Sequence, residues 1–313
     1  MTEHQRHELT AQDGRQIHVQ TWQPAGMPVG IIQVLHGLGE YADRYARFAT
    51  AATARHFAVV AHDHRGHGPH ASHQNHFADN GGWQSVLADA RRVNLYVRES
   101  FAGRPLILLG HSMGSTIAQN FAMHFSSDLD GLVLSASTLA SRPALYAGYA
   151  IAQLERWRLG TRGQSTVLNK LGFGDFNKAF RPARTEHDWL SRDQAEVDLY
   201  EADPLCGGPY SCGLWLDLLG GLLAITPDIA ISQVRADLPI LITGGAADPV
   251  GGDKGMTRLA MHYAQTGHQR ITTKIYADGR HEMLNETNRD EVTDDWLNWM
   301  NAIVNAGKKK PQT

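Results

Sequence analysis

The chain has 313 residues, of which 42% are hydrophobic and 19% charged, a composition typical of a folded globular protein and not of a disordered chain, collagen or a coiled coil. Its 29 basic and 32 acidic residues give a net charge of −3, which provides no basic surface for nucleic acid. The N-terminus lacks the apolar run of a signal peptide, and the most apolar stretch, residues 214–225, is too short to cross a membrane. Cys206 and Cys212 are expected to stay reduced. We therefore expect a cytoplasmic protein.

Strand and helix patterns alternate along the chain. Asp13-Gly14 separates two short polar and apolar alternations, which is typical of a β-hairpin. Short apolar runs that resemble parallel strands buried on both faces follow at 30–35, 57–61, 105–109, 132–136, 238–243 and 271–276. Helical spacing connects Val86, Ala90, Val93 and Val97, and again Val292, Trp296, Trp299 and Ile303. The alternation predicts an α/β fold with a mostly parallel central sheet flanked by helices.

One long interval, 137–234, interrupts this alternation. It shows no strand run and is rich in Leu, Tyr, Trp and Arg, with turn residues at Asp203-Pro204 and Gly207-Gly208-Pro209. The simplest account is a helical cap inserted into a core domain that is formed by residues 1–136 and 235–313.

The pentapeptide Gly110-His111-Ser112-Met113-Gly114 matches G-x-S-x-G and stands between the 105–109 strand run and a helical run. In so tight a turn, the residues two before and two after the serine must be small, so that the serine oxygen projects. The alternative is a glycine-rich turn with a surface serine, and the strand before and the helix after argue against it. We therefore predict that Ser112 is a nucleophile and that the Met113 amide is one oxyanion donor.

A serine hydroxyl needs a base to remove its proton and a carboxylate to orient that base. In this arrangement an acid and then a histidine follow the serine, each in a loop after a strand. Asp248 follows the 238–243 run, and His281 follows the 271–276 run. Asp278 is the rival acid, but it lies only three residues from His281 in the same loop, so we favour Asp248.

The second oxyanion donor is expected in the loop after an early strand. The sequence HGLGE at 36–40 follows the 30–35 run directly, and its glycines allow the backbone to approach a substrate. The Leu38 amide is the candidate donor. The alternative is a plain turn at the end of a strand.

Together these motifs resemble a known family. With HGLGE, DHRGHG at 63–68, GHSMG, GGAADP at 244–249 and GRHE at 279–282 in this order, the chain is similar to α/β-hydrolases of the monoacylglycerol lipase and bacterial lysophospholipase type over nearly its whole length. One departure is Tyr41, where the animal monoglyceride lipases carry histidine.

The resemblance implies a serine esterase. Ser112 would be the nucleophile, Asp248 the acid, His281 the base, and Leu38 and Met113 the oxyanion donors of a two-step acyl transfer through an acyl-enzyme. No metal or organic cofactor is implied. The expected substrate is a monoacylglycerol, a lysophospholipid or a similar small acyl ester, and the family's helical lid matches the interval 137–234.

Apolar residues of the cap are candidates for an acyl pocket, or else they form the core of the cap itself. They are Leu139, Leu145, Tyr146, Leu171, Phe173, Phe176, Leu214, Trp215 and Leu218. The cap is also the part that we expect to make any transient contact with a membrane or a lipid droplet. The sequence does not set the oligomeric state.

Two other functions fit parts of the pattern. Proline-releasing serine aminopeptidases share the fold and the triad. A ligand receptor built on a hydrolase scaffold belongs to a different class and can keep an intact triad.

Histidine is unusually frequent, at 17 residues, and six lie between 62 and 76. His62, His64 and His67 belong to the family's loop after a buried strand, which we expect at the rim of the active site. His70, His73 and His76 have spacings that suggest metal ligands, but no element gathers them on one face, so a solvated loop is favoured.

Overall fold

The computed structural model describes residues 2–307, and its eight strands form one sheet in the order β1-β2-β4-β3-β5-β6-β7-β8. The first two strands form the predicted antiparallel hairpin, and β2 also pairs antiparallel with β4. All later pairs are parallel. The strands are β1 (Glu3–Thr10), β2 (Gln16–Gln23), β3 (Gly30–Leu35), β4 (Phe57–His62), β5 (Leu106–His111), β6 (Gly131–Ser135), β7 (Ile240–Gly245) and β8 (Ile271–Tyr276).

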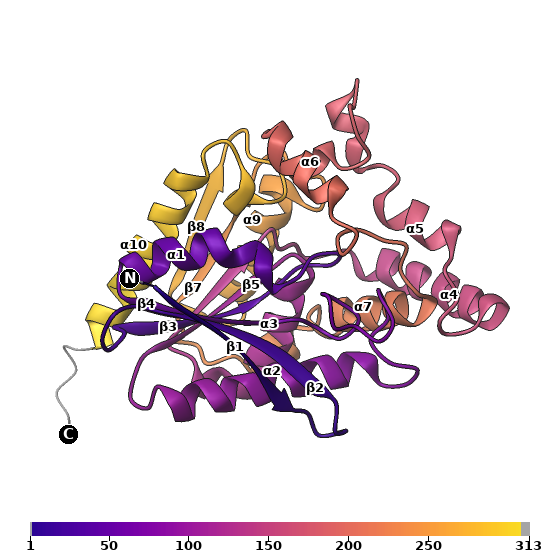
Figure 1. Ribbon diagram of the computed structural model, residues 1–313. Coiled ribbons are helices and arrows are strands. Elements are labelled where there is room, and N and C mark those ends of the chain that lie inside the picture. Colours follow the sequence, from indigo (N-terminus) through magenta and orange to yellow (C-terminus); the bar gives the residue numbers. More distant parts are fainter. Residues whose placement is uncertain (1, 308–313) are drawn as a thin grey trace.

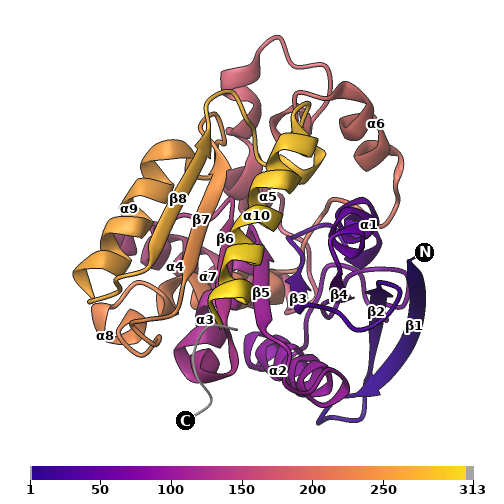
Figure 2. The same cartoon turned by 90° about the vertical axis from the view of Figure 1, so that its left-hand side faces the viewer.

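Helices cover both faces of the sheet, as predicted (Figures 1 and 2). α1 (Ala46–Ala54) and α10 (Arg289–Gly307) pack on one face. α2 (Gly82–Ser100), α3 (Met113–Phe125) and α9 (Gly252–Gln265) pack on the other face. Short 3-10 helices at Ala42–Tyr45, Ser126–Asp128 and Met283–Asn285 connect these elements.

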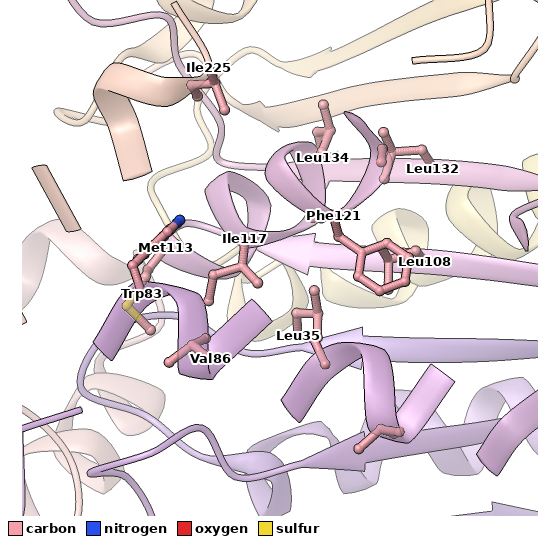
Figure 3. Close-up of a cluster of buried hydrophobic side chains, with 14 of the residues drawn as sticks. Leu35, Trp83, Val86, Leu108, Met113, Ile117, Phe121, Leu132, Leu134 and Ile225 are labelled. Carbon is pink, nitrogen blue, oxygen red and sulfur yellow. The ribbon is translucent and has the colours of Figure 1, made fainter. Parts of the chain in front are cut away.

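The larger core lies between α2, α3 and the sheet. Figure 3 shows Ile117 and Phe121 of α3 among Leu35, Leu108 and Leu134 of the strands, with all five side chains buried. The α2 stripe Val86, Ala90, Val93 and Val97, predicted from its spacing, faces the same core. Burial of a Leu, Ile or Phe side chain contributes about 1.5–3 kcal/mol, so this layer fixes α3 firmly behind β5.

Two predictions need correction. β8 was expected to be buried on both faces, but it is an edge strand, and its Thr272 and Thr273 are exposed. In α10, Val292 and Trp296 are buried as predicted, but the buried stripe continues through Met300 and Val304 in place of Trp299 and Ile303. The buried face, which also includes Leu297, is centred near Met300, and Trp299 and Ile303 lie at its edge, where they are half-buried.

Between β6 and β7 the described chain forms helices joined by loops, with no strand and one isolated bridge between Gln164 and Ser211. α7, the most apolar of these helices, packs against α2, α3 and α4. α4 and α5 lie at the right of Figure 1, and α6 lies nearer its top. The division into cap and core at 137–234 stays a prediction. The elements are α4 (Arg142–Leu159), α5 (Thr166–Phe173), the 3-10 helices Phe176–Phe180 and Asp188–Leu190, α6 (Gln194–Ala202), α7 (Cys212–Ala224) and α8 (Asp228–Ile231).

No helix in the described part of the chain is both long and apolar enough to span a membrane. Cys206 and Cys212 are free thiols.

Candidate active site

Ser112 occupies a sharp turn between β5 and α3. Its φ of 52° and ψ of −117° lie in a region that L-residues rarely adopt, at a cost of about 1–3 kcal/mol. The turn is held by the Ser112 amide, which donates to the Ser135 carbonyl at 2.9 Å. A Cβ at Gly110 would collide with the backbone of Gly114, and one at Gly114 would collide with the Leu35 carbonyl. The crowding explains why the motif needs glycine at both positions.

His281 and Asp248 form a buried pair. Asp248 follows β7, His281 follows β8, and the ring Nδ1 lies 2.9 Å from each carboxylate oxygen. Burial disfavours the charged imidazole, but the negative charge of Asp248 and its hydrogen bond outweigh burial, so the pKa of His281 is raised. The rival Asp278 has an 84% exposed side chain, and its nearest charged partner is Arg192 at 3.9 Å. The structure thus places Asp248, and not Asp278, against the ring.

Ser112 and His281 both line one cavity of about 910 Å³. Within the described residues no hydrogen bond joins the serine hydroxyl to the His281 ring. Such bonds are often long without substrate and tighten when substrate is bound. The strand ends at β3, β5, β7 and β8 all meet at this edge of the parallel sheet, which is why residues far apart in sequence gather there.

The loop after β3 is held by its own side chains. The His64 amide donates to His36 Nε2 at 2.9 Å, so His36 Nδ1 carries the proton that it shares with the Gly37 carbonyl at 2.7 Å. The Gly37 amide donates to Glu40 at 2.5 Å. Neither the Leu38 nor the Met113 amide has an acceptor among the described residues, and both residues line the cavity. Two N–H groups of residues that line the cavity therefore lack an acceptor among the described residues, as donors to an oxyanion must.

The predicted pocket residues divide into two groups. Leu145, Phe173, Phe176 and Trp215 line the cavity, together with Leu171 and Leu218. Leu139 and Leu214 instead belong to the core, and Tyr146 lies outside the cavity with 55% of its surface exposed. Because successive residues of a helix point in different directions, Leu145 of α4 faces inward while its neighbour Tyr146 faces outward. The cavity also contains residues that sequence reasoning missed: Asn169, Trp189, Leu190, Tyr200, Tyr210 and Val250.

A buried ion cluster beside the cavity was also missed. Arg44 forms a bidentate pair with Glu282 at 2.6 and 2.7 Å and reaches Glu40 at 3.1 Å. Burial opposes ionisation of both carboxyls, and it raises the pKa of Glu40. For Glu282 the charge and hydrogen bonds of Arg44 outweigh burial and lower its pKa to about 2. Arg44 therefore connects the loop before α1 to the residue after His281.

Replacing Arg44 by methionine should lower the free energy of unfolding by about 3–5 kcal/mol, because Glu40 and Glu282 would remain buried without a cation. Urea denaturation at neutral pH measures this loss. The control is Arg6→Met, which breaks the exposed pair with Asp43 and should cost less than about 1 kcal/mol. Equal losses for the two variants would contradict the assigned role of Arg44.

The histidine-rich segment contains two different environments. His64 and His67 pack against His36, and His62 packs against His64. All three are buried and none lines the cavity, so their expected place at its rim is wrong. His70 and His73 are exposed, as expected for a solvated loop. His76 corrects that prediction, because it is buried between Ser211 at 2.9 Å and Asp79 at 3.1 Å. No group of three metal-binding side chains within residues 2–307 is arranged to hold an ion.

Comparison with known proteins gives concordant matches. A family model described as "Serine aminopeptidase, S33" matches residues 26–288. Human monoglyceride lipase is 29% identical over 301 residues, covering 95% of this chain and 89% of the lipase. Monoacylglycerol lipase of Mycolicibacterium smegmatis is 28% identical over 298 residues, covering 94% and 96%. The crystal structure of a thermostable carboxyl esterase from Bacillus coagulans superimposes with a TM-score of 0.88 at 26% identity, covering 96% of this chain and 99% of the esterase.

Proposed function

The chain belongs to the α/β-hydrolase family described as serine aminopeptidase S33, and on that premise we propose that it is a serine esterase acting on a monoacylglycerol, a lysophospholipid or a similar small acyl ester. The fold and the family resemblance predicted from the sequence are confirmed. Hydrolase activity of the lipase type follows from the relatives. The acyl-enzyme mechanism, the site residues and the substrate are our proposal, and a cytoplasmic location stays a prediction.

The observation that carries the proposal is the Asp248–His281 pair beside a cavity that Ser112 also lines. In the proposed reaction, Ser112 attacks the ester carbonyl while His281 takes the hydroxyl proton and Asp248 stabilises the resulting imidazolium. The Leu38 and Met113 amides hold the negative oxygen. His281 then protonates the departing alcohol, and water, activated by His281, releases the fatty acid from the serine.

The charge of the cavity favours esters over peptides with a free amino terminus. A substrate ammonium group needs a carboxylate that is not already neutralised. Glu40 and Glu282 line the cavity, but Arg44 bonds to both. The third carboxylate of the lining, Glu186, forms no ion pair among the described residues, but it is exposed, so solvent and salt screen its attraction for an ammonium group. The apolar residues Leu145, Phe173 and Trp215 suit an acyl chain.

The test is a panel of p-nitrophenyl esters from two to sixteen carbons, run beside a monoacylglycerol, a lysophospholipid and proline β-naphthylamide. We expect turnover of the esters, with an optimum that reports the depth of the pocket. Turnover of the proline amide alone would establish the aminopeptidase alternative. Labelling of Ser112 by a fluorophosphonate without turnover of any ester would favour a receptor and overturn the proposal.

We place the contact with a lipid surface on the outer face of α4. This face is apolar at helical spacing and exposed, and Trp157 is 84% exposed. Arg142 and Arg156 flank it, which suits an anionic membrane. The face consists of Pro143, Ala147, Ala150, Leu154 and Trp157.

The double variant Leu154→Ser/Trp157→Ser should weaken binding to phosphatidylcholine–phosphatidylglycerol vesicles at least about tenfold, because two large apolar side chains no longer enter the bilayer. Cosedimentation with the vesicles measures the affinity. The control is Leu199→Ser, which removes an exposed apolar side chain from α6. Equal binding by the double variant and the wild type would exclude this face.

A further inference from the structure

One segment of the interval between β6 and β7 lies directly on the loop that carries Leu38. We call residues 203–211 the strap. The Gly207 amide donates to the Gly39 carbonyl at 2.8 Å, and the Tyr41 hydroxyl donates to Asp203 at 2.8 Å. Asn75, which lies outside the strap, donates from its side chain to the Gly207 carbonyl at 3.0 Å, and its backbone carbonyl accepts from the Ser211 amide at 3.0 Å.

The packing between strap and loop is close. Gly39 has a φ of +69°, and a Cβ there would collide with the Tyr210 hydroxyl and approach the Gly207 Cα to 3.1 Å. Only glycine permits both this conformation and this approach. A shift of the strap is therefore transmitted to the backbone at Gly39.

The Leu38 amide lies between two fixed points. On one side, His36 bonds the Gly37 carbonyl, which belongs to the same planar peptide as the Leu38 N–H. On the other side, the strap bonds the Gly39 carbonyl. The Gly37 carbonyl is held by His36, a buried residue of the core, and not by the strap. The second point depends on the position of the strap, and therefore on what fastens the strap.

We propose that Tyr41 is a positioning residue whose hydroxyl, through Asp203, holds the strap on the Gly39 carbonyl and so keeps the Leu38 amide directed at the developing oxyanion. The inference rests on the proposed function. Tyr41 does not line the cavity, so it acts through the strap and not on the substrate. Tyr41 is also the residue at which the sequence departs from the animal monoglyceride lipases, and this contact gives that departure a role.

The variants are Tyr41→Phe, Asp203→Ala and the double variant, assayed with p-nitrophenyl butyrate. We expect kcat to fall about tenfold in each, with KM within twofold, because loosening one oxyanion donor costs less than the 100-fold or more of losing it. The double variant should lose no more than either single variant, since both break the same contact. Asp203→Asn keeps an acceptor for Tyr41 and should restore most of the activity.

A second measurement separates positioning from general damage. An alkyl trifluoromethyl ketone adds to the serine and forms an oxyanion, so its affinity should fall by the same factor as kcat, whereas the KM for p-nitrophenyl butyrate should stay within twofold. Tyr96→Phe is the matched control, because its hydroxyl has no hydrogen-bond partner among the described residues and the ring packs against the core.

The outcomes are distinct. Unchanged kinetics in Tyr41→Phe, or a higher KM with unchanged ketone affinity, would overturn the role of Tyr41 and leave the esterase proposal intact. A wild-type protein that hydrolyses no ester would overturn the proposed function and this inference with it.

Discussion

Replacing Ser112 by alanine is expected to lower kcat for p-nitrophenyl esters about a million-fold, the loss typical of hydrolases of this kind when the nucleophile is removed. Alanine keeps the backbone constraint at a φ of 52°, so the variant should fold with a near-native unfolding midpoint. Steady-state kinetics and circular dichroism measure the two quantities. A folded variant that keeps more than about one per cent of the activity would show that another residue attacks the ester.

The same assay decides which acid serves His281. Asp248→Asn should lower kcat about ten-thousand-fold, because the ring loses the carboxylate that fixes its tautomer and stabilises its positive charge. Asp278→Asn is the matched control. Its carboxylate is exposed and makes no contact with the ring, so its kcat should stay within about twofold of the wild type. The reverse result would reassign the acid.

Lowering the pH from 7 to 5.5 is expected to reduce the free energy of unfolding by roughly 4 kcal/mol. The reason is the buried histidine cluster of His36, His62, His64 and His67. Burial lowers the pKa of all four, to about 3 for His62 and about 4 for His67. Among the described residues, both ring nitrogens of His62 and of His64 lack hydrogen-bond partners, so a proton added there would be poorly stabilised.

The free energy of unfolding falls with the pH because the unfolded chain binds more protons than the folded chain. Below a pH of about 6.5 the unfolded chain takes up protons that the folded chain refuses, so each histidine costs up to about 1.4 kcal/mol per pH unit until its folded pKa is reached. Groups whose pKa is higher in the folded chain stabilise it as the pH falls, and they offset part of this loss of stability. Burial raises the pKa of Asp63 and Asp217 to about 6, and the pKa of His281 is raised as well.

Guanidinium denaturation at pH 7 and 5.5 measures the difference. His62→Leu removes one titrating group and its unsatisfied nitrogens, so it should gain about 1 kcal/mol more at pH 5.5 than at pH 7. His124→Leu, at an exposed position on α3, should change both values alike. A wild-type protein equally stable at both pH values would refute the linkage.

The sequence predicts the site to the extent that local patterns determine it. Ser112, Asp248 and His281 each stand directly after an apolar run, and parallel strands bring such positions together at one edge of the sheet. The pattern is weaker for β8, where Thr272, Thr273 and Lys274 interrupt the apolar residues, as suits an edge strand and not a strand buried on both faces. It is also weaker for α10, where adjacent apolar residues leave the phase of the helix ambiguous.

Arg44 and Tyr41 could not be assigned in this way. Arg44 meets Glu282 across 238 positions, and Tyr41 meets Asp203 across 162. Neither pair has a spacing that a motif could capture, because both depend on how whole elements dock. The same limit explains Leu145 and Tyr146, since an apolar composition does not reveal which side of α4 faces the cavity.

The strand order leaves the sheet with two open edges, β1 and β8, where another strand could in principle add. The outer strand β1 carries Glu3, Arg6 and Glu8 at exposed positions, and β8 carries Lys274 paired with Asp295 at 2.8 Å. Charges of this kind discourage edge-to-edge pairing between copies, because an incoming strand would have to desolvate them. The protein thus keeps an open sheet without offering a template for aggregation.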